Sequence, residues 1–144
     1  MKLHIVTIGE PKLQYAKLGW DEYAKRLGRF HQLRATHLAD RLAMDSPAIL
    51  HAAGKAYLIA MAIEGEQMAS QELSRFLDRR AHEGMELCFV IGGPDGLPPA
   101  IITDADQRWS LSQLTFPHDL AMVVLAETLY RASTISAGHP YHRG

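Results

Sequence analysis

The five residues before the C-terminal glycine combine side chains that suit contacts with a nucleic acid. Residues 139–143, His-Pro-Tyr-His-Arg, bring together two imidazoles, a phenol and a guanidinium. Imidazole exchanges a proton near neutral pH, arginine pairs with phosphate, and aromatic rings stack on unpaired bases. Because chain ends are often frayed and without function, a solvated tail and a functional tail both stay open.

A polar pair precedes this tail. Glu127 and Arg131 are four residues apart, which on a helix places them side by side. If it is exposed, such an ion pair is worth only a few tenths of a kcal/mol. Arg131 also interrupts an apolar stretch, so a partly buried guanidinium with a polar task is the competing interpretation.

A glycine-rich loop follows an apolar run of strand length. In residues 92–96, Gly-Gly-Pro-Asp-Gly, the glycines allow backbone amides to approach a ligand closely, and Pro94 stiffens the loop. The loop is no dinucleotide fingerprint, because the proline biases Gly93 away from a helix and no Gly-Lys-Ser/Thr follows. A plain turn and a ligand-binding loop are both compatible with this pattern.

The spacing of apolar residues predicts one α/β domain over residues 1–144. Residues 56–63 and 85–91 are nearly continuous apolar runs with a helix between them, the signature of a parallel sheet covered on both faces. In such a sheet, ligands bind outside the carboxyl ends of the strands, where residues 61–65, 91–96 and 111–117 fall. The predicted strands span 2–8, 31–38, 56–63, 85–91 and 108–111; the predicted helices span 13–27, 46–53 with Ser46 as N-cap, a segment from N-cap Ser70 to before Gly84, 99–106 and 118–137.

The last predicted helix is apolar on every side. Residues 120–126 are seven apolar residues in succession, whereas a surface helix needs only an apolar stripe. The helix therefore needs a second apolar partner besides its sheet. A second copy of the chain, packed isologously, and further elements of the same subunit are the two candidates.

Composition narrows the class of protein. The chain has 144 residues, 22% of them charged, with a net charge of -1, which excludes a polycation that binds nucleic acid through charge alone. Residues 1–41 nevertheless hold eight Lys and Arg against four Asp and Glu. The lone Cys88 lies in an apolar run and is predicted to be buried. We expect no metal site, no membrane span, and a cytoplasmic location.

Four segments resemble, in order and nearly in spacing, the ribosomal RNA large-subunit methyltransferase H family of the SPOUT superfamily. They are residues 91–97 (IGGPDGL), 109–118 (WSLSQLTFPH), 126–132 (AETLYRA) and 139–143 (HPYHR). The resemblance is strong over residues 55–144 and weak at the first strand and helix. It implies a SPOUT-type α/β fold with a mostly parallel sheet, helices on both faces and a C-terminal deep trefoil knot, which is an exception to the rule that chains avoid knots.

The resemblance also implies an activity. Family members are homodimers that bind S-adenosyl-L-methionine in the knot and methylate N3 of pseudouridine 1915 in the large-subunit 23S rRNA of the assembled ribosome. The family has Leu-Asp where this chain has Met61-Ala62, and residues 31–54 are shorter than the family stretch. The residues implied for cofactor binding are Met61, Gly92, Gly93, Ser112, Gln113, Leu114, Thr115, Phe116 and Pro117; those implied for catalysis are Arg131, Tyr141, His142 and Arg143; and those implied for RNA binding are His139 and Arg143.

Methyl transfer to an imide nitrogen defines what the tail must do. The displacement needs no metal, but the nucleophile and the methyl carbon must be held in line. The N3 proton must leave or be shared first, for which His142 and Arg143 are the candidates. Two rivals stay open: a non-catalytic ribosome-binding or assembly factor with the same fold, and an α/β enzyme for another adenosyl ligand.

Overall fold

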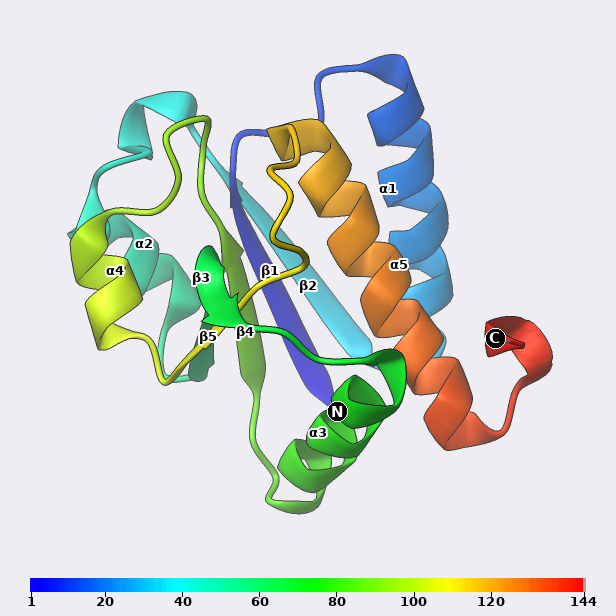
Figure 1. Ribbon diagram of the computed structural model, residues 1–144. Coiled ribbons are helices and arrows are strands. Elements are labelled where there is room, and N and C mark those ends of the chain that lie inside the picture. Colours follow the sequence, from blue (N-terminus) through cyan, green and yellow to red (C-terminus); the bar gives the residue numbers. More distant parts are fainter. Residues whose placement is uncertain (144) are drawn as a thin grey trace.

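The computed structural model describes residues 1–143, which form a central sheet flanked by helices (Figure 1). The helices and strands follow the predicted order along the chain. The strands are β1 (Lys2–Ile8), β2 (Gln32–Leu38), β3 (Tyr57–Glu66), β4 (Leu87–Ile91) and β5 (Gln107–Trp109); the helices are α1 (Gln14–Leu27), α2 (Ser46–Ala53), α3 (Ser70–His82), α4 (Pro99–Asp104) and α5 (His118–Ala137), with 3-10 turns η1 (Asp40–Leu42) and η2 (Pro140–His142).

The sheet has the strand order β2-β1-β4-β3-β5, and every pair of neighbours is parallel. The predicted parallel sheet is therefore confirmed. Because all strands run the same way, their carboxyl ends meet at one edge. The loops after β1, β2, β3, β4 and β5 thus leave the sheet on the same side.

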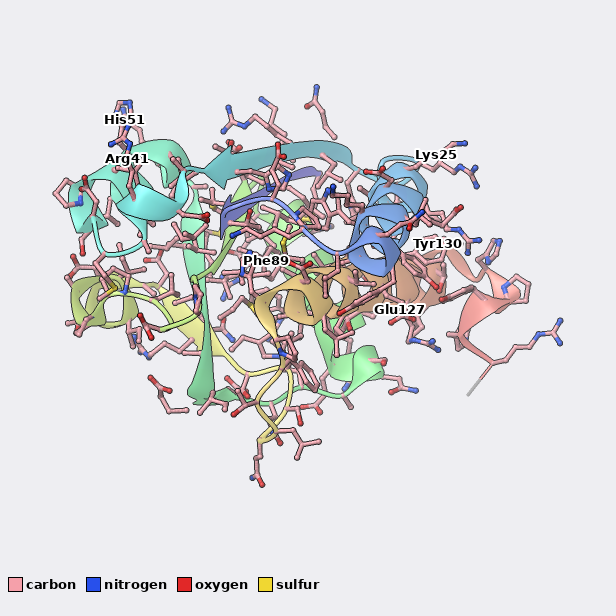
Figure 2. The ribbon with its side chains drawn as sticks, turned by 90° about the horizontal axis from the view of Figure 1, so that it is seen from above. Lys25, Arg41, His51, Phe89, Glu127 and Tyr130 are labelled. Atoms are coloured by element: carbon pink, nitrogen blue, oxygen red, sulfur yellow. The ribbon has the colours of Figure 1, made fainter. Side chains whose placement is uncertain are left out.

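Each face of the sheet carries its own core, because side chains alternate along a strand. On β1, Leu3 and Ile5 pack with α1, α3 and α5, whereas Val6 and Ile8 pack with α2 and α4. Phe89 on β4 is fully buried at the centre of the molecule, whereas Lys25 and His51 point outward (Figure 2). Helices on both faces agree with the predicted fold class, and the trefoil knot stays a prediction.

Two predicted helix caps are wrong by one residue. Asp45, not Ser46, caps α2, because its Oδ1 accepts the Ala48 amide at 3.0 Å. At α3 the N-cap position is Ala69, whose own amide donates to Glu72 Oε1 at 3.0 Å. At α2 the aspartate before Ser46 supplies the capping oxygen, whereas at α3 the carboxylate of Glu72 accepts the amide of the N-cap residue itself.

Helix α5 has the predicted bounds, and its apolar surface is divided between two environments. Met122, Leu125 and Leu129 are fully buried against the sheet and neighbouring helices. Val123 faces α1 at Gly19, where a side chain would meet it within 3.0 Å. Val124 stays partly exposed. Packing within the subunit therefore explains most of this helix but not all of it.

Cys88 is buried as predicted, with no exposed surface, and burial raises the pKa of its thiol to about 12. The thiol is therefore un-ionised and unreactive at neutral pH. Among residues 1–143, no cluster of three or more His, Cys, Asp and Glu side chains is arranged to bind a metal ion. No helix in the same range is both long and apolar enough to cross a membrane.

Candidate functional site

A cavity of about 550 Å³ opens at the carboxyl ends of β3, β4 and β5. Its wall is built by the three segments predicted to bind a ligand. Eight of the nine residues implied for cofactor binding line it: Met61, Gly92, Gly93, Ser112, Leu114, Thr115, Phe116 and Pro117. The ninth, Gln113, is exposed on the same loop and lies outside the lining.

The glycine-rich loop forms a tight turn at the cavity wall. The amide of Gly96 donates to the carbonyl oxygen of Gly93 at 3.0 Å. A Cβ atom at Gly92 would lie 2.6 Å from both the Gly96 oxygen and the Leu97 nitrogen. Only glycine fits at position 92, because the chain doubles back on itself there. The loop is thus a specific turn that presents its backbone to the cavity. A ligand-binding loop requires such an arrangement.

The loop from Ser110 to Pro117 is held by its own serines. Ser110 Oγ donates to the carbonyl oxygen of Ser112 at 2.8 Å, and the Leu114 amide donates to Ser112 Oγ at 3.0 Å. These local bonds fix the backbone that lines the cavity. The side chain of Leu114 remains 71% exposed, so it is available to a bound molecule or a second subunit.

Two further residues at the cavity were not among those predicted to bind. His118 Nδ1 donates to the carbonyl oxygen of Gly92 at 3.0 Å, which ties the first residue of α5 to the glycine turn. Trp109 closes the cavity from β5 and packs edge-on against Phe89. Both residues flank the serine-rich loop within the 109–118 motif. The aromatic residue at one end of that motif and the polar residue at the other were the sequence signal that could have identified them.

The cavity is suited to a ligand that joins an aromatic ring to polar groups. Met61, Ile91, Leu111 and Phe116 give it apolar walls, between which the glycine turn and the serine loop offer backbone groups. Its volume lies within the range of about 300–1,000 Å³ typical of small-molecule sites. Near it, the Trp109 indole N–H is buried without a partner in residues 1–143. This donor set fits a nucleoside-like cofactor such as S-adenosylmethionine.

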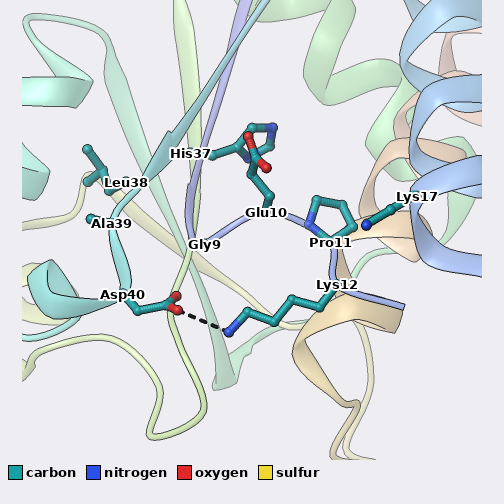
Figure 3. Close-up of a pocket in the computed structure, with 9 residues that line it drawn as sticks. All are labelled: Gly9, Glu10, Pro11, Lys12, Lys17, His37, Leu38, Ala39 and Asp40. Atoms are coloured by element: carbon teal, nitrogen blue, oxygen red, sulfur yellow. Dashed lines mark hydrogen bonds and ion pairs between the residues drawn. The ribbon is translucent and has the colours of Figure 1, made fainter. Parts of the chain in front are cut away.

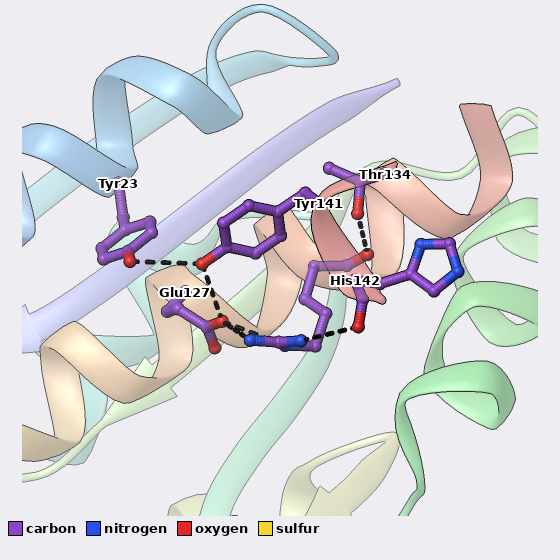
Figure 4. Close-up of polar contacts among 6 residues, drawn as sticks. Tyr23, Glu127, Thr134, Tyr141 and His142 are labelled. Atoms are coloured by element: carbon purple, nitrogen blue, oxygen red, sulfur yellow. Dashed lines mark hydrogen bonds and ion pairs between the residues drawn. The ribbon is translucent and has the colours of Figure 1, made fainter. Parts of the chain in front are cut away.

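The C-terminal tail is docked on its own subunit (Figure 4). The Tyr141 hydroxyl donates to Glu127 Oε1 at 3.1 Å and lies 3.2 Å from the Tyr23 hydroxyl. Its ring packs edge-on against Tyr130, with 4.7 Å between ring centroids. The tail is therefore docked and not frayed, and a functional role for it stays a prediction.

Arg131 organises this cluster. Its guanidinium donates twice to Glu127 Oε1, at 2.7 and 3.0 Å, and once to the carbonyl oxygen of His142 at 3.3 Å. It also lies 5.1 Å from the centroid of the Tyr141 ring. The hydrogen bond to Glu127 raises the pKa of Arg131 further, so it stays charged. The ion pair of Arg131 and Glu127 therefore holds the tail in place and is not an isolated surface ion pair.

The polar atoms of the tail have distinct states. Burial and the hydrogen bonds with Tyr23 and Glu127 raise the pKa of Tyr141 well above its usual value, so the phenol acts as a donor and not as a base. His142 Nδ1 lies 3.1 Å from the carbonyl oxygen of His139, which can only accept, so Nδ1 carries the proton. His142 Nε2 then keeps a lone pair. His139 and Arg143 are exposed.

The cavity and the tail lie apart in one chain. His142 lies beside Arg131, which follows His118 by 13 residues on the same helix, or about 20 Å at 1.5 Å per residue. Figure 1 shows the C-terminus and the loop before α5 near opposite ends of that helix. Since methyl transfer needs contact near 3–3.5 Å, the tail does not serve the cavity of its own subunit.

Comparisons with known proteins identify the family of this chain. The sequence profile of a family described as "Predicted SPOUT methyltransferase" matches residues 1–142. The chain is 56% identical to the ribosomal RNA large subunit methyltransferase H of Deinococcus deserti, covering 99% of this chain and 100% of that protein. It is 54% identical to the protein of the same name from Deinococcus radiodurans, with full coverage of both.

A solved structure is similar in fold. The probable methylase family protein from Haemophilus influenzae superposes with a TM-score of 0.60 at 10% identity, covering 96% of this chain and 69% of the other. At that identity the likeness concerns the fold alone.

Proposed function

Given that the chain belongs to the ribosomal RNA large subunit methyltransferase H family of SPOUT methyltransferases, we propose that it methylates N3 of a pseudouridine in the large-subunit rRNA of assembled ribosomes, with S-adenosylmethionine as methyl donor. The observation that carries this proposal is the cavity at the carboxyl ends of β3, β4 and β5. Eight residues that the family resemblance assigns to the cofactor meet there. The reaction would take place in the cytoplasm, where ribosomes work.

The cavity residues would hold the cofactor in two ways. The side chains of Met61, Ile91, Leu111 and Phe116 would enclose its adenine ring, and the backbone of the Gly92–Gly93 turn would approach its polar edge. When bound, S-adenosylmethionine supplies an electrophilic methyl group on a sulfonium. The site orients that group and excludes water, so catalysis rests largely on position.

A homodimer would complete the site. In one chain the tail lies about 20 Å along α5 from the cavity. Two copies packed with antiparallel α5 helices would place the tail of each beside the cavity of the other, in a closed isologous contact. Partly exposed Val124 on α5, together with exposed Tyr15 and Leu18 on α1, offers apolar surface for that contact.

The tail would then accept the proton of the target nitrogen. The Nδ1 proton of His142 is held by the carbonyl oxygen of His139, so Nε2 is free to accept the N3 proton. Exposed Arg143 would stabilise the anion that forms, or pair with a phosphate, and His139 would contact the RNA. Arg131 and Tyr141 position the tail rather than transfer a proton, because their polar atoms are engaged with Glu127.

Binding of S-adenosylmethionine, measured by calorimetry, tests the cavity. We expect the wild type and Ala121→Ser to bind, and Ala121→Phe to lose binding, because Ala121 lines the cavity and a phenyl group would fill it. Transfer of labelled methyl groups to ribosomes that lack the modification then tests the reaction. A protein that binds ribosomes but not S-adenosylmethionine would instead be the non-catalytic assembly factor.

A further inference from the structure

A second cavity, of about 510 Å³, opens at the carboxyl ends of β1 and β2 (Figure 3). We call it the Gly9 pocket, and the cofactor cavity does not include it. Its lining is mainly polar and carries both signs of charge. The lining residues are Gly9, Glu10, Pro11, Lys12, Lys17, His37, Leu38, Ala39 and Asp40.

The pocket is rigidly built. Gly9 has φ +81°, a left-handed backbone conformation that other residues rarely adopt, so the turn after β1 favours glycine. Asp119 Oδ2, on the first turn of α5, accepts the amides of Lys12 and Leu13 at 2.8 and 2.6 Å. These bonds anchor the segment after β1, so the pocket is formed before any ligand arrives.

The hydrogen bonds around His37 define its state. Thr7 Oγ1 donates to the carbonyl oxygen of Gly9 at 2.7 Å, so it accepts from His37 Nδ1 at 2.6 Å. His37 Nε2 is then an acceptor, and it has no partner within residues 1–143. The carboxylate of Glu10 and the ammonium of Lys17 are likewise unpaired in that range, whereas Lys12 Nζ pairs with Asp40 at 3.0 Å. The pocket therefore offers two free acceptors and one free cation.

The Gly9 pocket and the cofactor cavity are neighbours at one edge of the sheet. A Cβ atom at Gly93 would lie 3.4 Å from Ile8, the last residue of β1 before Gly9. On α5, His118 contacts the glycine turn of the cavity, and the adjacent Asp119 anchors the segment that lines the pocket. A polynucleotide that places one base at the cavity would pass the pocket with a nucleotide close by.

We propose that the Gly9 pocket binds a nucleotide of the RNA substrate that flanks the methylated one, an inference that rests on the proposed function. A bare anion is disfavoured, because Glu10 and Asp40 would repel it. A nucleotide complements both the positive and the negative groups of the pocket. Its phosphate pairs with Lys17, while the N–H groups of its base donate to Glu10 and His37. The base would be one with an exocyclic amino group, because the single N3–H of uracil cannot donate to Glu10 and His37 at once.

Two variants test this pocket in a ribosome-binding assay with ribosomes that lack the modification. Lys17→Ala should raise the Kd about fivefold or more and reduce the salt slope by about one, as loss of one phosphate contact does. Lys55→Ala is the matched control. It removes the same charge from an exposed residue just before the amino end of β3, and should leave both quantities unchanged.

Glu10→Ala separates base recognition from simple electrostatics, because alanine removes the hydrogen-bond acceptor, which glutamine would keep, together with the charge. Removing a negative charge from a surface that faces RNA should tighten binding if charge alone matters. If Glu10 accepts a hydrogen bond from a base, the variant should instead bind ribosomes about fivefold or more weakly, while its calorimetric affinity for S-adenosylmethionine is unchanged.

Wild-type affinity in Lys17→Ala, or equal or tighter binding by Glu10→Ala, would overturn the proposal. Failure of the wild type to bind S-adenosylmethionine is a different result, and it would overturn the proposed function. The two failures are distinguishable because ribosome binding is measured without turnover.

Discussion

Sharing of one active site between two chains can be tested by pairing two inactive variants. Ala121→Phe blocks the cavity and leaves the tail intact, whereas a double variant with His142→Ala and Arg143→Ala disarms the tail and leaves the cavity open. Each variant alone should be nearly inactive in methyl transfer. Neither substitution touches Tyr141, which anchors the tail through Glu127 and Tyr130, so both chains should fold.

The magnitude follows from the separation along α5. In the proposed dimer, a tail held about 20 Å from its own cavity would serve its partner's cavity. A mixed dimer would then have one cavity and one tail that are both intact and that face each other. Random pairing of equal amounts makes about half of the dimers mixed, each with one working site of two. The mixture should therefore recover about a quarter of wild-type activity.

The assay is methyl transfer to unmodified ribosomes by the two chains co-expressed with different tags. Mixed dimers purified through both tags should approach about half of the wild-type rate per dimer. Two tail-variant chains carrying the same two tags serve as the control and should stay inactive. Inactive mixed dimers that still bind S-adenosylmethionine would refute the shared site, because sites contained in one chain cannot be rescued by pairing.

Three smaller perturbations test the packing and the charges. Val124→Asp should convert the dimer to a monomer in sedimentation at micromolar concentration, because the carboxylate would be buried unpaired; an unchanged dimer would place the interface elsewhere. Tyr141→Phe should cost about 1 kcal/mol of unfolding free energy in urea and slow methyl transfer without changing cofactor affinity. Burial lowers the pKa of His31 to about 4 from 6.5. As the pH falls, the unfolded chain therefore binds a proton at this residue before the folded chain does, so the free energy of unfolding should decrease between pH 7 and pH 4. In His31→Gln that pH-dependent loss should shrink by about 2 kcal/mol, allowing for partial solvent screening, whereas exposed His51→Gln should change nothing.

The sequence predicted the fold where local and long-range preferences agree. The apolar runs at 56–63 and 85–91 were correctly predicted as the strands β3 and β4, and α5 has the predicted bounds. The caps of α2 and α3 were missed because a carboxylate, Asp45 or Glu72, supplies the oxygen at each helix start although a serine that also suits a cap lies nearby. The sequence pattern does not rank these two kinds of residue.

The candidate site was predictable in part for the same reason. Strand ends and glycines marked the cavity, because a parallel sheet brings those loops to one edge. The separation of cavity and tail was not predictable from spacing, since it depends on the tail turning back to Glu127 and Arg131. The Gly9 pocket joins residues 9–17 with 37–40, which no single motif connects.

The position of β1 in the sheet also determines the order in which the chain can fold as it is synthesised. Its partner β2 follows closely, but the other edge of β1 pairs with β4, so Leu3 waits for Leu87. Helix α5, which covers one face of these strands, is made last of all the long elements. A strand whose residues from Leu3 to Ile8 are all buried in the folded protein thus keeps an open edge and an uncovered face through most of translation, as expected of a topology dominated by non-local pairs. The central strand of the sheet is therefore completed only after most of the chain has been made.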